Sequence, residues 1–463
     1  MSGIDRRDFL GGSLAAGASG AGQAAPAARP NVIVYFTDQQ RWDSVGAYGC
    51  PMDLTPNLDR AAAGGVRFER AFTSQPVCSP ARSTLQTGKY PTTTGVIRNG
   101  PTLKPGEVTL AHLFGRHGYR TGYIGKWHLG GTGADPVPPA ARGGYDEWWT
   151  AADMLERTST PFEGYVWDAA NRKVSFNKYR PDAMTDLAVD FIREKKSAPF
   201  FLFLSQLEPH HDIQVNAHVA PPGYAERYRD SYWTPPDLTP YPGDWKSQLP
   251  PYYGAVARLD ESFGRIQQEL KDQGLDRNTI VVFTSDHGSH FRTRNTEYKR
   301  SCHEGSIRVP LVFAGPGFEA GRVVDRLVSL VDVPPTILAA AGIEAPREMQ
   351  GRSLLELARG RSAGWRDEIL VQMRTEALQR AIRTERYKYC IFDPGNRNQN
   401  EPHSLNYTER YLYDLRGDPH EHVNLIGRPQ YRKIATELGE RLIVRMKEIG
   451  EPAPKIATTR FYA

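Results

Sequence analysis

The chain has 463 residues, of which 39% are hydrophobic and 24% charged, a composition typical of a globular protein with one large core and room for a smaller unit. Its net charge is +5 and no long block of lysine or arginine occurs, so the charge pattern gives no indication of nucleic-acid binding. The mean hydropathy is −0.54 and no apolar run approaches the length of a membrane-spanning helix, so we expect no membrane span.

The first 27 residues are typical of an export signal rather than of a folded element. Arg6 and Arg7 precede a Gly/Ala-rich stretch that ends near Ala27, the arrangement of a twin-arginine signal with a small-residue cleavage site. We therefore expect the twin-arginine machinery to export the protein to the periplasm or the exterior of a bacterial cell. A flexible low-complexity tail is the alternative, since Gly/Ala/Ser tracts also occur as linkers.

Strands and helices alternate from about residue 30. The continuous apolar run at 31–37 is the pattern of a buried parallel strand that delivers polar residues at its C-terminal end. Further strands are expected at 122–124, 200–205, 279–284 and 309–314, and helices at 55–64, 183–195, 254–273 and 333–341. This alternation predicts an α/β fold in which helices sandwich a large, mainly parallel sheet, forming an N-terminal catalytic domain over residues 30–361. Residues 220–251, rich in Pro, Tyr and Trp, fit either a substrate-facing loop or a packed excursion.

The pattern changes from about residue 362. Short strands are expected at 368–373, 378–384, 387–392 and 411–415, followed by a closing helix at 433–447. These elements predict a smaller C-terminal α+β domain over residues 362–463, with an antiparallel sheet and one helix.

Cys78 lies in the run QPVCSPARSTLQTG at residues 75–88, which predicts a helix starting beside the cysteine. Ser79 is a good N-cap, a proline suits the first turn, and Gly88 ends the helix. Backbone N–H groups and the positive end of the helix dipole would then face Cys78, with Arg82 on the same turn, so we expect an oxyanion to bind there. The alternative for Cys78 is a buried thiol or half of a disulfide.

Polar residues also follow two of the expected strands. Asp38 and Gln39 come after the first strand, and Asp286 and His287 come after the strand at 279–284. Oxygen and nitrogen ligands at the ends of neighbouring parallel strands can converge on one divalent cation. By itself the second pair would more often be a turn after a strand.

Three further segments carry residues suited to anion chemistry. GKWHLG at 125–130 places Lys126 and His128 on one face of an extended segment. EPH at 208–210 supplies His210 after the strand at 200–205, and His211 follows directly. KRSCHEGSIRVP at 299–310 begins with Lys299.

The run at 75–88 resembles the type I sulfatase signature, Cys-x-Pro-x-Arg followed by a Thr-Gly pair, and every specified position matches. The segments at 125–130, 208–210 and 299–310 resemble further signatures of that family, and the resemblance spans about residues 30–430. It implies an alkaline phosphatase-like fold and a sulfuric ester hydrolase. It also implies that a formylglycine-generating maturation enzyme oxidises Cys78 to formylglycine (3-oxoalanine), an aldehyde that hydrates to a gem-diol.

The same resemblance implies roles for the matched residues. Arg82, Lys126 and Lys299 would bind the sulfuryl oxygens. His128 would hold or deprotonate the gem-diol, and His210 would protonate the departing alcohol, with His211 as its rival.

The implied metal ligands are Asp38, Gln39, Cys78, Asp286 and His287. Gln39 stands where a second aspartate is usual in the family, and His287 where an asparagine is usual. Calcium is the metal that the resemblance implies. A site with fewer formal charges and a histidine nitrogen leaves manganese, magnesium and zinc as alternatives.

Export and the aromatic segment favour a carbohydrate or polysaccharide sulfate as substrate, because aromatic faces stack on sugar rings. The candidates for contact with the leaving group are His211, Trp233, Tyr252 and Tyr253. Two alternatives stay open: a phosphate or phosphonate monoester hydrolase of the same superfamily, and a protein that binds sulfated glycans without cleaving them.

Overall fold

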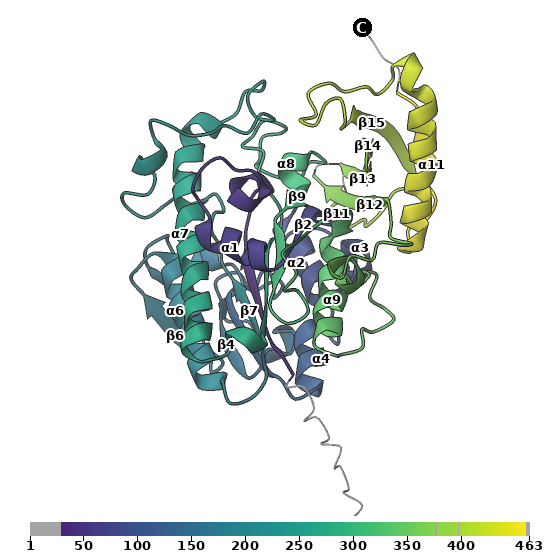
Figure 1. Ribbon diagram of the computed structural model, residues 1–463. Helices are drawn as coiled ribbons and strands as arrows, with labels where there is room; N and C mark the ends of the chain where they lie inside the picture. The colour runs from purple at the N-terminus through teal and green to yellow at the C-terminus, as the bar shows by residue number, and fades with distance from the viewer. Residues whose placement is uncertain (1–28, 376, 397, 460–463) are drawn as a thin grey trace, which may run out of the picture.

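The computed structural model describes residues 29–375, 377–396 and 398–459. The predicted export signal lies outside these ranges. Two β-sheets organise the described part, a sheet of eleven strands and a smaller sheet of five (Figure 1). None of the helices in these ranges combines the length and the apolar character needed to cross a membrane.

The large sheet is mixed, with a parallel centre. Its strands are β1 (Asn31–Thr37), β2 (Val66–Phe72), β3 (Arg120–Lys126), β4 (Trp148–Ala152), β5 (Gly164–Trp167), β6 (Lys173–Phe176), β7 (Phe200–Ser205), β8 (Thr279–Ser285), β9 (Arg308–Val309), β10 (Leu311–Ala314) and β11 (Arg322–Ser329). They lie in the order β11-β2-β10-β8-β1-β7-β3-β4-β5-β6, with β9 paired to β2. The run from β8 through β1, β7 and β3 to β4 is parallel, so these strands all end at one edge of the sheet.

Helices cover both faces of this sheet because successive side chains of its central strands point to opposite sides. In β1, Val32 and Val34 belong to the hydrophobic cluster on one face, and Ile33 and Tyr35 to the cluster on the other. The helices that pack on the first face are α2 (Cys78–Thr87), α4 (Leu110–Arg116) and α9 (Val333–Ala340), and those on the second are α1 (Pro56–Gly64), α6 (Arg180–Lys195) and α7 (Trp245–Asp272). Short helices complete this part: α3 (Pro91–Thr94), α5 (Leu155–Thr158), α8 (Glu304–Ile307) and α10 (Leu355–Ala358).

The small sheet packs between a helix and the main body. It consists of β12 (Glu368–Arg374), β13 (Leu378–Thr384), β14 (Tyr387–Asp393), β15 (Asn406–Asp414) and β16 (Lys455–Ala457), antiparallel except for the β15–β16 pair. Leu438 and Leu442 of α11 (Arg432–Glu448) pack on one of its faces. On the other face, Val371 and Met373 share a cluster with Phe72 and Ile307 of the large unit.

The predicted α/β class and the smaller antiparallel sheet with its helix are confirmed, but several element bounds are wrong. The expected strand 309–314 is divided into β9 and β10, because Pro310 between them has no N–H to donate. Helix α7 begins at Trp245, nine residues earlier than expected, and contains Pro250 and Pro251 within its early turns. Residues 220–244 hold one 3-10 turn and pack against α7 through Tyr228 and Leu238, as the packed-excursion alternative predicts.

Candidate functional site

The site lies at the edge where the parallel strands end. β8 and β1 pair in register up to Thr37 opposite Ser285, so Asp38 and Asp286, the next residue of each strand, leave the sheet side by side. Lys126 is the last residue of β3, two strands away from β1. The order and register of the strands therefore explain why these side chains lie close together.

Cys78 is the first residue of α2 and is 1% exposed. The N-cap is Val77 rather than the expected Ser79, so the serine lies inside the first turn. Asn99 takes over the capping role from another segment, since its Oδ1 accepts a hydrogen bond from the Ser79 backbone N–H at 3.1 Å. Gly88 ends the helix in the left-handed conformation, as predicted, with φ of 69°.

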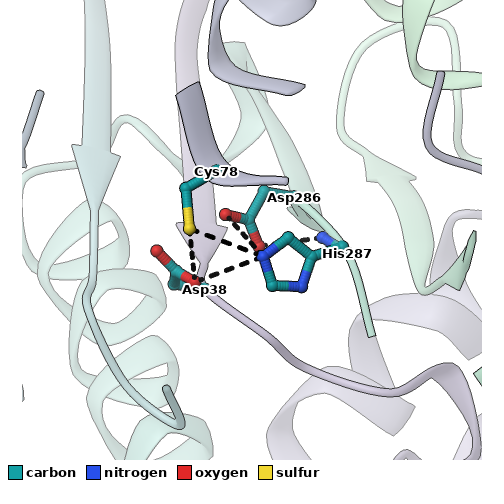
Figure 2. Close-up of side chains that lie close together, drawn as sticks. All are labelled: Asp38, Cys78, Asp286 and His287. Carbon is teal, nitrogen blue, oxygen red and sulfur yellow. Dashed lines mark hydrogen bonds and ion pairs between the residues drawn. The ribbon is translucent and has the colours of Figure 1, made fainter. Parts of the chain in front are cut away.

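Figure 2 shows Asp38, Cys78, Asp286 and His287 facing one another, and their ligand atoms all lie within 4.8 Å of one another. The Cys78 Sγ is 3.6 Å from Asp38 Oδ1 and 3.5 Å from His287 Nε2. Asp286 Oδ2 is buried and accepts no hydrogen bond from the described residues. A buried carboxylate oxygen without a donor, beside other oxygen and nitrogen atoms, fits a divalent cation.

The charges of the two aspartates support this fit. Burial raises the pKa of Asp286 to about 7, and the negative charge of Asp38 adds to the shift. For Asp38 burial acts in the same direction, but the nearby cations, Lys126 foremost, lower its pKa overall. A cation between the two carboxylates would remove their mutual repulsion.

Gln39 lies beside this group with its side chain turned to a serine. Its Nε2 donates to Ser289 Oγ at 3.3 Å, and its backbone N–H donates to Asp286 Oδ1 at 2.9 Å. Its φ of 68° is left-handed, which carries the chain sharply away from β1. Gln39 thus orients Asp286 through its backbone, and its part in metal binding stays a prediction.

Three cations reach the cysteine or its aspartate neighbour. Lys299 Nζ donates to Cys78 Sγ at 2.9 Å. Lys126 Nζ and an Arg82 guanidinium N–H both donate to Asp38 Oδ2, at 3.0 and 2.9 Å. Burial raises the pKa of Cys78, but Lys126 and Lys299 lower it well below its usual value overall. The position of Cys78 therefore favours a negatively charged group.

Two histidines, His128 and His210, lie near these cations. His210 Nε2 is 3.2 Å from Lys299 Nζ, and burial together with the Lys299 charge lowers the pKa of His210. His128 lies just beyond β3 with φ of 58°, so the expected extended segment turns at this residue, and its backbone N–H donates to the Asp153 carbonyl at 2.8 Å. Both histidines line the same cavity as Cys78.

This site cavity, of about 510 Å³, is lined by Cys78, Asn99, Gly100, Lys126, His128, Gly131, Gly133, Asp153, Met154, Glu156, Arg157, His210, Ile213, Glu297, Lys299 and Arg300. Sequence analysis did not single out Glu156, although its carboxylate is 3.4 Å from Lys126 Nζ. Burial opposes ionisation of Glu156, but Lys126 lowers its pKa to about 2, so the pair is charged. Glu156 lies in a short helix outside any recognised motif, and no sequence signal marks it.

The four expected leaving-group contacts lie elsewhere. None of His211, Trp233, Tyr252 and Tyr253 lines the site cavity. Tyr252 and Tyr253 are fully buried in a cluster against the packed excursion, and Trp233 packs against the same cluster. His211 is buried against Tyr298, with ring centroids 4.4 Å apart. The structure corrects this expectation, since Asn99, Arg157 and Ile213 line the cavity wall and these four side chains do not.

Comparison with known proteins decides the family. The family model described as Sulfatase matches residues 30–343, and a second model, described as N-sulphoglucosamine sulphohydrolase, C-terminal, matches residues 296–448. The chain belongs to the sulfatase family. As a member, this sulfatase is a sulfuric ester hydrolase, which confirms the resemblance drawn from the motifs.

Relatives align with this sulfatase over nearly its whole length. An ulvan-active sulfatase of Formosa agariphila is 30% identical, with 91% of this chain and 82% of the relative covered. The N-acetylglucosamine-6-O-sulfatase of Bacteroides thetaiotaomicron is 26% identical, with 92% and 88% covered. The crystal structure of the putative sulfatase YidJ of Bacteroides fragilis is 27% identical and superposes with a TM-score of 0.79, covering 93% of this chain and 98% of that one. The structural match confirms the predicted alkaline phosphatase-like architecture.

Proposed function

We propose that this sulfatase hydrolyses sulfate monoesters of a carbohydrate or polysaccharide and uses a formylglycine made from Cys78. The observation that carries the proposal is the convergence of Lys299, Lys126 and Arg82 on a buried Cys78 at the start of a helix. A sulfate ester bears its negative charge on peripheral oxygens, and this charge needs a cationic, largely dehydrated pocket. One relative and one family model named for amino-sugar sulfates support a sugar as the leaving group.

The cations have separate tasks in this proposal. Lys299, whose Nζ reaches Cys78 Sγ, binds a sulfuryl oxygen next to the nucleophilic position. Lys126 and Arg82 are held through Asp38 and balance the charge on the remaining oxygens. Because all three side chains are at least nine-tenths buried, their interaction with an anion is weakly screened by water.

Asp38, Asp286, His287 and position 78 would hold a divalent cation, with Gln39 as a further ligand and calcium as the proposed metal. When present, the metal and the hydrated aldehyde supply an ionisable hydroxyl at neutral pH as nucleophile. His128 holds the proton of that hydroxyl on the cavity side. His210 Nε2 and Lys299 Nζ, 3.2 Å apart, form the pair from which the leaving oxygen takes its proton.

The cellular setting is part of the proposal. Residues 1–27 would direct export by the twin-arginine machinery, and a formylglycine-generating enzyme would oxidise Cys78. The mature enzyme would then act in the periplasm or outside the cell, as an N-terminal catalytic domain (30–361) followed by a C-terminal domain (362–463).

The test is co-expression with a formylglycine-generating enzyme, followed by mass analysis of the Cys78 peptide and parallel assays. p-Nitrophenyl sulfate, p-nitrophenyl phosphate and phenylphosphonate are compared, together with inorganic sulfate release from sulfated oligosaccharides. We expect the aldehyde at residue 78, preference for sulfate esters, and no turnover by Cys78→Ala. Preference for phosphate or phosphonate would favour the hydrolase alternative. Binding of oligosaccharides by aldehyde-bearing protein, with no sulfate released, would favour the non-catalytic alternative.

A further inference from the structure

A second cavity adjoins the site cavity, and the segment that carries Lys299 lines both. It has a volume of about 470 Å³ and lies between residues 294–303 of the large unit and strands β13 and β15 of the small sheet. Its lining includes Arg294, Arg300, His303, Gln379, Arg410 and Tyr411, and we call it the arginine cavity. Glu297 and Arg300 line both cavities, so the two cavities are immediate neighbours.

The arginine cavity carries an excess of positive charge. Three arginines face a single acid, Glu297, which pairs with Arg300 at 3.0 Å. Arg294 is fixed by its donation to the backbone carbonyls of His420 and Glu421, both at 3.0 Å. Two arginine charges therefore lack a carboxylate partner within the cavity.

Arg410 is the arginine best placed to bind a ligand. Its guanidinium lies over the rings of Phe392 and Tyr411, 4.9 and 5.1 Å from their centroids, and pairs with no carboxylate among the described residues. Aromatic packing of this kind fixes the plane of the guanidinium and leaves its edge N–H groups for an anion.

His303 also lines this cavity. It is 4% exposed, its Nε2 is 3.0 Å from the Tyr413 hydroxyl, and its buried Nδ1 has no hydrogen-bond partner among the described residues.

We propose that the arginine cavity binds a second anionic group, a sulfate or a carboxylate, on a sugar neighbouring the one whose ester is cleaved. This inference rests on the proposed function and narrows its substrate class to polyanionic oligosaccharides. Arg410 gives charge-assisted hydrogen bonds to the anion. The enzyme thus recognises two charges along one sugar chain, one in each cavity.

The experiment compares matched oligosaccharides that carry the same cleavable sulfate and a neighbouring sugar that is neutral, sulfated or a uronate. For the wild-type enzyme we expect kcat/KM to be about tenfold higher with an anionic neighbour, mainly through KM. Arg410→Met removes this advantage, and Arg410→Lys retains part of it. Arg416→Met is the matched control, because Arg416 is exposed just beyond β15 and lines neither cavity, and it keeps the full advantage.

The sulfated and uronate arms identify which anion the cavity prefers. Equal kcat/KM for neutral and anionic neighbours in the wild type would overturn the inference, as would an unchanged ratio in Arg410→Met. A loss in Arg410→Met that is the same for all three oligosaccharides would also overturn it, since the cavity would then bind sugar without reading charge. Failure of the proposed function gives a different result: aldehyde-bearing enzyme would cleave neither p-nitrophenyl sulfate nor any of the oligosaccharides.

Discussion

Lys299 Nζ lies 2.9 Å from Cys78 Sγ, although 221 positions separate the two residues in the sequence. The contact brings the segment after β8 onto the first residue of α2. Lys299 is 9% exposed, and its ammonium has no ion-pair partner among the described carboxylates, so its charge is directed at whatever occupies position 78.

Replacing Lys299 by alanine should lower kcat on p-nitrophenyl sulfate by 10²- to 10³-fold, on the order of the loss of one preorganised donor to transition-state charge. The aldehyde content at residue 78 is measured alongside, so that failed maturation is not mistaken for failed catalysis. Lys271→Ala, at the exposed end of α7, is the control and keeps wild-type activity. A Lys299→Ala enzyme with full aldehyde content and unchanged kcat would contradict the role proposed for this lysine.

Glu156 is expected to act as a positioning residue for Lys126. Its carboxylate is 3.4 Å from Lys126 Nζ, and the pair lies in a buried wall of the site cavity. Glu156→Gln keeps the shape of the side chain and removes its charge, and we expect kcat to fall about tenfold, as for a buried charged hydrogen bond. Glu163→Gln, an exposed acid in the following loop, is the matched control.

A purely structural role for Glu156 would show as a lower melting temperature with unchanged kinetics of the folded fraction. The pH profile separates the two roles, because loss of the Glu156 charge should change the pH dependence of kcat without a comparable loss of stability. Unchanged kinetics at every pH would contradict the positioning role.

Sequence reasoning located the elements that are buried on both faces. The strand at 31–37 is apolar at almost every position, and the structure gives it the same bounds. By contrast, β2 has the sequence VRFERAF, and β6 has KVSF at the sheet edge. Charged residues interrupt the apolar pattern of these strands, and their places in the sheet depend on tertiary pairing.

Some residues of the site were predicted from the sequence and others were not. Motif residues such as Cys78, Lys126 and Lys299 were predicted, and the structure brings them together. Glu156 was missed because only folding brings it to Lys126. Tyr252 and Tyr253 were misplaced because the irregular segment was expected to reach residue 251 and the helix to begin only at residue 254. As part of α7, both rings instead point into the core. The early start of α7 was not predicted because Pro250 and Pro251 are residues that usually interrupt a helix.

Removal of the divalent cation should abolish activity. After dialysis against EDTA we expect kcat/KM on p-nitrophenyl sulfate to fall at least 10²-fold, because the ionisable hydroxyl would lose its metal partner. Adding back calcium, magnesium, manganese and zinc separately then ranks the metals. Full activity in protein shown by elemental analysis to be free of metal would exclude a catalytic cation.

Gln39→Asp tests how charge count sets metal affinity. It adds a third carboxylate beside Asp38 and Asp286, at a position where aspartate tolerates the φ of 68°. We expect calcium to bind about tenfold more tightly, measured by calorimetry in the absence of substrate on protein that keeps residue 78 unchanged. Gln214→Asp, outside the metal group and off the site-cavity wall, is the control. Unchanged affinity in Gln39→Asp would place residue 39 outside the ligand set.

The buried histidines should make the fold sensitive to acid. Burial lowers the pKa of His290 from its ordinary 6.5 to about 4, and the ring is completely enclosed beside the Lys299 carbonyl. Because the unfolded chain then binds more protons between pH 6.5 and pH 4, stability falls as the pH drops through this window and is fully present above it. For His290 alone the loss between pH 7 and pH 5 is about 2 kcal/mol.

His290→Gln removes this titration and keeps a donor for the Lys299 carbonyl. We expect the difference between the unfolding free energies at pH 7 and pH 5, measured by urea titration, to shrink by about 2 kcal/mol in this variant. His117→Gln, at an exposed histidine after α4, leaves the difference unchanged. Burial raises the pKa of Asp260 to about 6, so its contribution to stability increases as the pH falls, opposite to that of His290. This contribution is the same in the wild type, His290→Gln and His117→Gln and does not affect the comparison. An equal pH dependence in wild type and His290→Gln would show that His290 has the same pKa in the folded and unfolded chains, against the effect of its burial.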